Sequence, residues 1–354
     1  MPDSFPKARG TSFNPKNRFE TLETVAFDDG WDNAEETPPP PTTILLDRTK
    51  SILSENDSPD IGFEVSINPY RGCEHGCVYC FARPSHAYLG LSPGLDFETK
   101  LLVKPEAPRL LAGELSKRGY RCRLLAIGTN TDPYQPVERR LRVMRGCLQV
   151  LADFHHPVAI TTKSHLVTRD IDLLAPMAAR RLASVAVSVT TLDRDLCRKL
   201  EPRAATPAKR LEAIRELSAA GIPVTVLVAP VIPFVTDHEL EAILAAARQA
   251  GASHAGTILL RLPHEVKELF AAWLDAHFPE RARHVLSLMR QSSGGKLYDA
   301  TFGQRQTGTG HHAQLLAQRF RLAERRLGFA GQRSALDSSQ FRVPPKAGDQ
   351  LSLL

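Results

Sequence analysis

Three cysteines within eight residues, Cys73, Cys77 and Cys80, are the side chains whose type and spacing are best suited to chemistry. Three residues separate the first pair and two separate the second, in a segment that also carries Gly72 and Gly76. Thiolates at this spacing can ligate three irons of a [4Fe–4S] cluster and leave the fourth iron without a protein thiolate from the motif. A small molecule can bind at that open iron and take part in electron transfer. The spacing therefore predicts an iron–sulfur centre.

Two other uses of cysteine compete with this interpretation. A zinc site needs a fourth nearby Cys or His to complete a tetrahedron, and His75 and His86 are the histidines available near the motif. His75 lies inside the first gap, where its backbone is already committed to the loop. Disulfides are typical of secreted chains with an even set of cysteines, whereas three of the six cysteines here are packed together and three are scattered. Spacing and surroundings favour the cluster.

Composition and charge are those of an ordinary globular enzyme. The chain has 354 residues, 42% of them hydrophobic and 24% charged, which is enough to bury a sizeable core. No run reaches the roughly 18 apolar residues that span a bilayer, and residues 1–20 lack the apolar stretch of a signal peptide. Because a cluster also needs reducing surroundings, we expect a cytoplasmic protein with no membrane partner.

The formal net charge of +6 is spread along the sequence, with one basic concentration near the end. In residues 318–329, Arg319, Arg321, Arg325 and Arg326 follow helical spacing and could contact phosphates. Charged helix faces are common, so this segment makes nucleic acid a candidate partner without requiring one.

Short apolar runs alternate with amphipathic patterns through the middle of the chain. The runs predict strands at 63–68, 122–130, 158–163, 182–191, 222–231 and 256–263. The intervening patterns predict helices at 108–119, 137–154, 169–180, 206–221 and 236–251. This alternation indicates an α/β fold with parallel strands and right-handed crossovers. Thr206 is expected as a helix N-cap, and Thr236 with Glu239 matches a capping box.

The outer segments differ from this alternating core. Residues 1–60 contain the run EETPPPPTT and predict an extended, disordered Pro-rich lead. Residues 61–263 are the expected core, residues 264–330 a helical C-terminal extension packed on it, and residues 331–354 a polar tail.

Polar side chains are dense where the expected strands end, and ligand-binding residues of parallel α/β folds lie at those ends. The cysteine loop follows the first strand, and the other polar segments are 128–136, 161–164, 188–193 and 261–263. Because the carboxyl ends of parallel strands lie at one edge, we expect these segments to converge on one cavity.

Five segments resemble the radical S-adenosylmethionine (SAM) group related to spore photoproduct lyase, a group of undefined substrate. They are NPYRGCEHGCVYCFARP, TNTDPYQPVE, ITTKSHLVTRDIDLL, VSVTTLDRDLCRKLEPRAATPAKRL and VAPVIPF. The resemblance covers roughly residues 63–263. It implies a six-unit (β/α) partial TIM-like barrel, a [4Fe–4S] cluster and SAM as cofactors, and reduced flavodoxin or ferredoxin as the electron donor.

The resemblance also implies roles for individual residues. The cluster ligands correspond to Cys73, Cys77 and Cys80. The expected SAM-binding residues are Tyr79, Thr131, Asp132, Lys163, Ser188 and Thr190. Among these, Lys163 matches the lysine that meets the SAM carboxylate, and Ser188 matches a ribose contact. Lys163, Ser188 and Thr190 would also suit ordinary strand positions, and Asp132 an ordinary turn.

One position departs from the family pattern. The hydrogen-donating cysteine that follows the second strand of the lyase is replaced here by Thr129. Cys122 lies at the opposite end of that strand, and Cys147 and Cys197 are expected to be buried or incidental thiols. The lyase reaction on a thymine lesion is therefore not expected. The sequence identifies no catalytic side chain, and Tyr134 is a candidate hydrogen donor only.

The leading hypothesis is a radical SAM enzyme that cleaves SAM reductively and abstracts hydrogen from an unidentified substrate, with nucleic acid as a candidate. One alternative is an iron–sulfur protein that senses redox state without SAM turnover. Another is a nucleic-acid-binding module with structural zinc. The polar set after the strands favours the enzyme, because a sensor needs no site for SAM.

Overall fold

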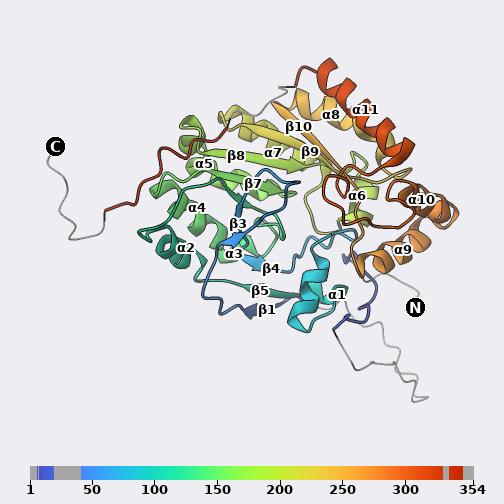
Figure 1. The fold of residues 1–354 in the computed structure, drawn as a ribbon, viewed down its shortest axis with the longest axis horizontal. Coiled ribbons are helices and arrows are strands. Elements are labelled where there is room, and N and C mark those ends of the chain that lie inside the picture. Colours follow the sequence, from blue (N-terminus) through green and yellow to red (C-terminus); the bar gives the residue numbers. More distant parts are fainter. Residues whose placement is uncertain (1–5, 7, 20–40, 330–334, 346–354) are drawn as a thin grey trace, which may run out of the picture.

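The computed structural model describes residues 6, 8–19, 41–329 and 335–345, and its main body is a mixed α/β fold built on a parallel sheet (Figure 1). Within the described residues, the strand order of this main sheet is β10-β9-β8-β7-β6-β3-β2. Neighbours from β3 to β10 pair in parallel, and β2 pairs antiparallel to β3. The strands are β2 Ser54–Glu55, β3 Val65–Ile67, β6 Leu125–Ile127, β7 Val158–Thr162, β8 Ala183–Ser188, β9 Val224–Val231 and β10 His254–Leu259. The predicted α/β fold with a parallel sheet is confirmed.

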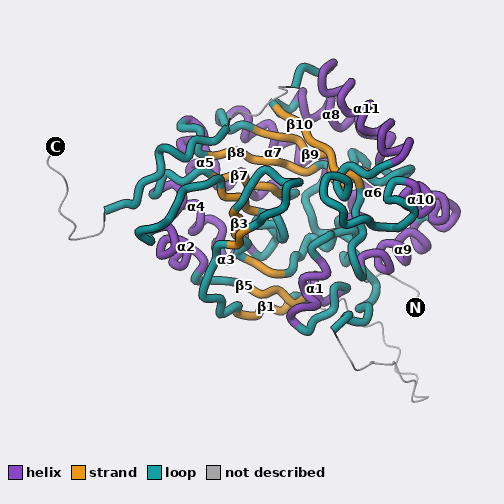
Figure 2. Tube along the Cα trace, viewed as in Figure 1, coloured by secondary structure: helices purple, strands orange, loops and turns teal. Residues whose placement is uncertain are grey.

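Burial explains why these short runs form strands. Every residue of β3 and β6 is buried, and in β7 buried residues alternate with half-buried ones. The nearly continuous apolar sequence of β9, VTVLVAPV, suits a strand covered on both faces. The helices α5 Ile171–Ala179, α7 Pro207–Ala219 and α8 Leu240–Gln249 pack against β8 and β9, and Figure 2 shows the helices arranged around the strands.

The helices that connect the strands follow the predicted alternation. They are η1 Arg83–Leu89, α1 Leu95–Thr99, α2 Ala107–Leu115, α3 Glu138–Leu141, α4 Val143–Asp153, η2 His165–Asp170, α5 Ile171–Ala179, α6 Arg194–Leu200, α7 Pro207–Ala219, η3 Asp237–Glu239 and α8 Leu240–Gln249. The Thr206 side chain accepts a hydrogen bond from Lys209 N, which confirms the predicted cap of α7. None of the described helices is both long and apolar enough to cross a membrane.

The single helix predicted at 137–154 is instead two helices, α3 and α4. The helical conformation is interrupted at Arg142, whose φ is 53°. The buried Glu138 carboxylate accepts hydrogen bonds from Met144 N at 3.1 Å and Arg145 N at 3.4 Å. The amide groups exposed by the break are thus bonded by a side chain from the preceding helix, which stabilises the new helix start.

The capping box predicted at Thr236 and Glu239 is wrong. The Thr236 hydroxyl accepts a hydrogen bond from Ile232 N at 2.9 Å instead of capping the helix. Glu239 accepts from Thr191 Oγ1 at 2.5 Å and from Leu192 N at 2.7 Å. Tertiary contacts with the loop after β8 therefore replace the local cap.

A smaller sheet, in the order β1-β5-β4, lies beside the main one. Its strands are β1 Thr43–Leu46, β4 Tyr70–Arg71 and β5 Lys100–Val103. β1 pairs in parallel with β5, and β4 pairs antiparallel to it. β4 leads directly into the cysteine loop.

Residues 8–19 pack on the cysteine loop, which differs from the disordered lead predicted over 1–60. Gly10 N and Thr11 Oγ1 donate to the Glu98 carboxylate at 2.9 and 3.0 Å. A Cβ on Gly10 would lie 1.7 Å from the carbonyl oxygen of Gly76, so only glycine lets the backbones approach this closely. Most of the Pro-rich run lies outside the described residues.

The predicted helical extension contains α9 Val266–His277, α10 Pro279–Gln291 and α11 Gly310–Arg326. The buried residues Phe270 and Trp273 of α9 share an apolar cluster with Val78 and Tyr79 of the cysteine loop. Part of the predicted polar tail, residues 335–345, is also placed on the core, where Arg342 N donates to Phe154 O at 3.0 Å. The domain boundaries themselves stay a prediction.

Candidate functional site

A cavity of about 200 Å³ lies at the carboxyl ends of the parallel strands. The cysteine loop and the segments that end β6, β7, β8, β9 and β10 all contribute to its wall. Its lining residues are Cys73, His75, Cys77, Tyr79, Cys80, Phe81, Gly128–Asp132, Thr161–Lys163, Ser188, Leu227, Ala229, Pro230 and Ile258–Arg261. The predicted convergence of the strand ends is therefore observed.

The cysteine loop presents three thiols to this cavity. Gly72 and Gly76 have φ values of 81° and 68°, which favour glycine and let the chain turn immediately before Cys73 and before Cys77. Cys73 N donates to Phe97 O at 2.9 Å, and Cys80 N donates to Cys77 O at 3.2 Å. All three cysteines are free thiols, and burial raises the pKa values of Cys77 and Cys80.

A buried ion pair holds the loop from behind. The Arg83 guanidinium donates to Cys77 O at 2.8 Å and to Gly76 O at 3.1 Å. It also pairs with the Glu98 carboxylate at 2.6 Å, and both side chains are 0% exposed. Since Glu98 also binds residues 10 and 11, one buried pair connects the N-terminal segment to the backbone of the cysteine loop.

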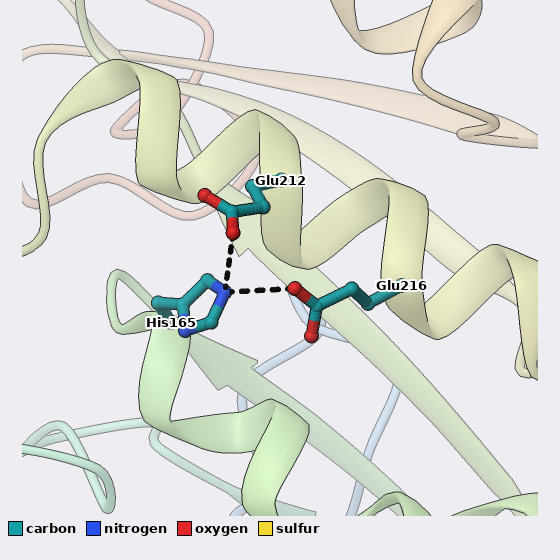
Figure 3. Close-up of side chains that lie close together, drawn as sticks. All are labelled: His165, Glu212 and Glu216. Atoms are coloured by element: carbon teal, nitrogen blue, oxygen red, sulfur yellow. Dashed lines mark hydrogen bonds and ion pairs between the residues drawn. The ribbon is translucent and has the colours of Figure 1, made fainter.

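The donor set fits a multi-iron cluster better than a single zinc ion. Four ligands at 2.3 Å in a tetrahedron lie about 3.8 Å from one another. Among the described residues, the one group of three Cys, His, Asp or Glu residues with all ligand atoms within 4.8 Å is His165, Glu212 and Glu216, outside the cavity (Figure 3). No group of three that includes a cavity cysteine meets this spacing among the described residues, and thiolates are the usual ligands of iron–sulfur clusters.

The His165 group of Figure 3 is explained by ion pairs on the molecular surface. His165 Nε2 lies 3.2 Å from Glu216 Oε1 and 3.8 Å from Glu212 Oε1. Glu212 also pairs with Lys209 at 2.6 Å. These partly exposed contacts connect η2 to α7 and lie apart from the cavity.

Lys163 is the predicted residue with the most contacts beside the cavity. Its ammonium group donates to Ser188 Oγ at 2.6 Å and to Ala229 O at 3.1 Å. It lies 3.3 Å from Glu201 Oε1, which in turn accepts from Thr190 Oγ1 at 2.7 Å. Lys163 is thereby fixed at the end of β7 and points across the ends of β8 and β9.

Glu201 is the centre of a buried charge group behind the cavity. Its carboxylate pairs with Arg210 and accepts a hydrogen bond from the Tyr79 hydroxyl. Burial alone would raise the pKa of Glu201, but Arg210 and Lys163 together lower it below the usual range. The carboxylate is therefore charged, and with two cations around it the group carries a net positive charge beside the cavity.

Asp132 has a larger role than a turn former. It accepts hydrogen bonds from Thr162 Oγ1 and Lys163 N, both at 2.7 Å, and lies 3.3 Å from His75 Nδ1. These bonds join the loops after β6 and β7 to the cysteine loop. Thr131, next to it, donates to Tyr70 O at 2.9 Å.

Two predicted residues do not line the cavity. Tyr134 is 0% exposed, and its hydroxyl donates to Asp170 Oδ2 at 3.1 Å within the core. The structure thus gives no support to Tyr134 as a hydrogen donor to a ligand. Thr190 is also 0% exposed and contacts Lys163 and Glu201 from behind the cavity wall.

Sequence reasoning missed Glu201, and it gave no individual role to Phe81 or Arg261, which both line the cavity. Arg261 follows β10 within a segment whose position at a strand end was recognised. No local sequence pattern indicates a role for Glu201. Its partners Tyr79 and Lys163 lie far away in the sequence, and Arg210 lies on another helix. Cys197, expected to be incidental, lies 3.6 Å from Glu201 Oε2.

Comparison with known proteins agrees with this geometry. The family described as the Radical SAM superfamily matches residues 67–247. The uncharacterized protein Rv2578c of Mycobacterium tuberculosis is 40% identical over 231 residues, which cover 65% of this chain and 68% of that protein. The uncharacterized protein MJ0683 of Methanocaldococcus jannaschii is 27% identical over 196 residues, covering 55% of this chain and 70% of that protein.

Among solved structures, the fold is similar to that of spore photoproduct lyase complexed with dinucleoside spore photoproduct. The TM-score is 0.58 at 16% identity, and the match covers 81% of this chain and 80% of the lyase. A lyase variant with bound AdoMet and the same dinucleoside gives a TM-score of 0.57 at 15% identity, over 81% of this chain and 80% of that one. These likenesses show the fold, and the family match over half of the chain shows that it belongs to the radical SAM superfamily.

Proposed function

We propose that this protein is a radical SAM enzyme that holds a [4Fe–4S] cluster through Cys73, Cys77 and Cys80 and binds SAM in the adjoining cavity. One observation carries the proposal: three free thiols line the same cavity as Lys163 and its net-positive group with Glu201 and Arg210. This combination provides both a metal donor set and a counter-charge for a carboxylate.

A [4Fe–4S] cluster held by Cys73, Cys77 and Cys80 would supply the electron for reductive cleavage of SAM, the chemistry that leads to hydrogen abstraction from a substrate. The residues of the chain bind and orient. Lys163 neutralises the SAM carboxylate, and Asp132 holds the backbone of Lys163 in place. The hydroxyl oxygens of Ser188 and Thr131 accept hydrogen bonds from SAM, since their hydrogens are donated to Ala229 O and Tyr70 O. Tyr79 and Thr190 act through Glu201 by fixing the position of the Lys163 ammonium group.

The finer features of the fold and the cellular setting belong to the same proposal. The parallel strands form a six-unit partial barrel over residues 61–263, and residues 264–330 are an extension packed on it. The protein works in the cytoplasm, and reduced flavodoxin or ferredoxin delivers the electron. The likeness to a lyase bound to a dinucleoside lesion supports nucleic acid as a candidate substrate. The lyase reaction itself is not proposed, because Thr129 stands where that family carries its hydrogen-donating cysteine.

The proposal is tested with anaerobically reconstituted protein, dithionite and SAM. We expect about four irons and four sulfides per chain, and formation of 5′-deoxyadenosine and methionine in equal amounts. A protein that assembles the cluster but forms no 5′-deoxyadenosine above a protein-free control would instead be a redox sensor. A colourless protein with one zinc ion would support the structural-zinc alternative.

A further inference from the structure

Arg261 is a half-buried cation at the cavity that has no direct hydrogen bond or ion pair within the described residues. It follows β10 and lines the cavity. Within the described parts of the chain, its guanidinium group has no hydrogen-bond acceptor and no carboxylate within ion-pair distance. Burial lowers the pKa of Arg261, because the more distant charges of Asp60 and Cys80 offset only part of the free-energy cost of burying the guanidinium group. A site of this kind is stabilised when a ligand supplies the missing anion.

Other interior arginines of the described chain contrast with it. Arg83 pairs with Glu98 and Arg210 pairs with Glu201, so each buried guanidinium has a buried carboxylate. Asp60 carries a carboxylate that could pair with Arg261. It instead accepts hydrogen bonds from Arg305 and from Gly303 N. The protein thus neutralises its structural arginines and leaves the arginine at the cavity available.

The position of Arg261 is fixed by an aromatic ring. Its guanidinium carbon lies 4.5 Å from the ring centroid of Phe81, which follows the cluster-loop residue Cys80. This cation–π contact orients the planar group without using its N–H donors. Phe81 lines the cavity and is 46% exposed, so this side of the cavity reaches solvent. A ligand can therefore approach from outside and meet both an oriented cation and an apolar ring.

The two cations of the cavity are separate in place and in bonding. Lys163 follows β7 and Arg261 follows β10, with β8 and β9 between these strands in the sheet. Lys163 already contacts Glu201 and Ser188, whereas Arg261 keeps its fork of donors open. The cavity therefore offers two anion-binding positions, of which the proposed SAM carboxylate uses the one at Lys163.

We propose that Arg261, oriented by Phe81, binds an oxyanion of the substrate at the open side of the cavity, so that the enzyme acts on an anionic substrate that carries a phosphate or a carboxylate. This inference rests on the proposed function, since it assigns the Lys163 position to SAM. A guanidinium fork matches both oxyanions in a bidentate geometry. The test distinguishes the two sources of charge.

Three probes that share a benzene ring separate the contributions of charge and ring: phenyl phosphate, benzoate and benzyl alcohol. Their dissociation constants are measured by anaerobic equilibrium dialysis against the reconstituted full chain, with and without SAM. We expect at least one charged probe to bind about tenfold or more tightly than benzyl alcohol, as charge-assisted hydrogen bonds require. The tighter of the two identifies phosphate or carboxylate. Equal binding of all three probes to the wild-type protein overturns the inference.

Variants connect that preference to Arg261. Arg261→Gln should abolish the preference for the charged probe, and Arg261→Lys should keep part of it, because lysine retains the charge but not the fork. Arg118→Gln, at an exposed position after α2 and away from the cavity lining, removes the same charge elsewhere and should keep the full preference. A full preference in Arg261→Gln, or an equal loss in Arg118→Gln, overturns the inference.

The dissociation constant for SAM separates this inference from the proposed function. Arg261→Gln should change it by less than about twofold, and SAM should not displace the charged probe. A tenfold loss of SAM affinity, or competition between SAM and the probe, would place the SAM carboxylate at Arg261 and overturn the inference. Wild-type protein that binds no SAM would contradict the proposed function, whatever the probes show.

Discussion

The two ends of the main parallel sheet are built in opposite ways. At the carboxyl end, polar and charged residues surround an open cavity that contains three thiols, Lys163 and Arg261. At the amino end, before β7, His156 lies 0% exposed between aromatic rings. Its Nε2 lies 2.7 Å from the Tyr120 hydroxyl, and its ring meets Phe341 edge-on with 5.6 Å between centroids.

The amino end is closed by a distant part of the chain. Phe341 belongs to the segment 335–345 and lies 6.3 Å, centroid to centroid, from the ring of Phe154. Asp337 in the same segment pairs with Arg181 at 3.1 Å. The comparison indicates that the carboxyl end is organised for ligands and the amino end for stability, as in other parallel α/β folds. Substitutions at the two ends should therefore have separable effects.

The largest effect is expected at the cluster ligands. Cys80→Ala should lose the visible cluster absorption and reduce 5′-deoxyadenosine formation below detection, because one thiolate ligand is missing. Cys122→Ala is the matched control, since Cys122 is a half-buried thiol near the amino end of β6 and does not line the cavity. Iron analysis and product assay measure both. Normal iron content and turnover in Cys80→Ala would contradict the assignment.

The next largest effect is a loss of stability at the amino end. Phe154→Ala removes a side chain that is 5% exposed and should lower the free energy of unfolding by about 3–5 kcal/mol. Leu322→Ala, at a position 52% exposed on α11, should have an effect below about 0.5 kcal/mol. Urea unfolding gives both values. At temperatures where Phe154→Ala is folded, its SAM cleavage should match that of the wild type. A loss of cleavage in the folded variant would show that the amino end of the sheet affects the site as well as stability.

Lys163→Gln tests the carboxyl end with a smaller expected effect. Loss of the cation should weaken SAM binding by about tenfold, while Glu201 keeps Arg210 as its partner and the fold persists. Lys100→Gln removes a lysine that is 45% exposed and paired with Asp96, and should leave SAM affinity unchanged. Equilibrium dialysis measures the dissociation constants. Unchanged affinity in Lys163→Gln would assign the SAM carboxylate to another cation.

The smallest effect concerns pH and the amino end. Burial lowers the pKa of His156 from 6.5 to about 4, so the folded protein holds this ring neutral. The stability that this neutral ring contributes is fully present above pH 6.5. It is lost as pH falls toward 4, because His156 takes up a proton in the unfolded chain at a higher pH than in the folded protein. Between pH 7 and 5.5 the loss from one such group is about 1 kcal/mol. Urea unfolding of His156→Gln should show a pH dependence smaller by that amount, and an identical dependence would show that His156 does not titrate as described.

Local patterns in the sequence predicted much of the carboxyl end. The cysteine spacing indicated a metal-binding loop, and the polar residues after each strand converged as expected, including Asp132, Lys163 and Ser188. Parallel strands make such predictions possible, because their ends meet at one edge whatever their exact order. The resemblance to a known family added the individual roles.

The remaining features depend on contacts between distant parts of the chain. Glu201 binds Tyr79, 122 positions away, and a buried charge of this kind leaves no periodic signal. The capping motif at Thr236 was overridden because Glu239 serves the loop after β8 instead. Residues 8–19 look like a polar lead, yet Thr11 is 1% exposed because it meets Glu98. Tertiary partners of this kind cannot be read from local composition.

Electron paramagnetic resonance of the dithionite-reduced protein shows directly whether three cysteines hold a cluster with one iron open to SAM. We expect a [4Fe–4S]⁺ signal in the wild type that changes shape when SAM is added, and no such signal in Cys80→Ala. A wild-type signal that stays identical with saturating SAM, or a protein that reconstitutes with zinc and gives no signal, would contradict a three-cysteine cluster that binds SAM.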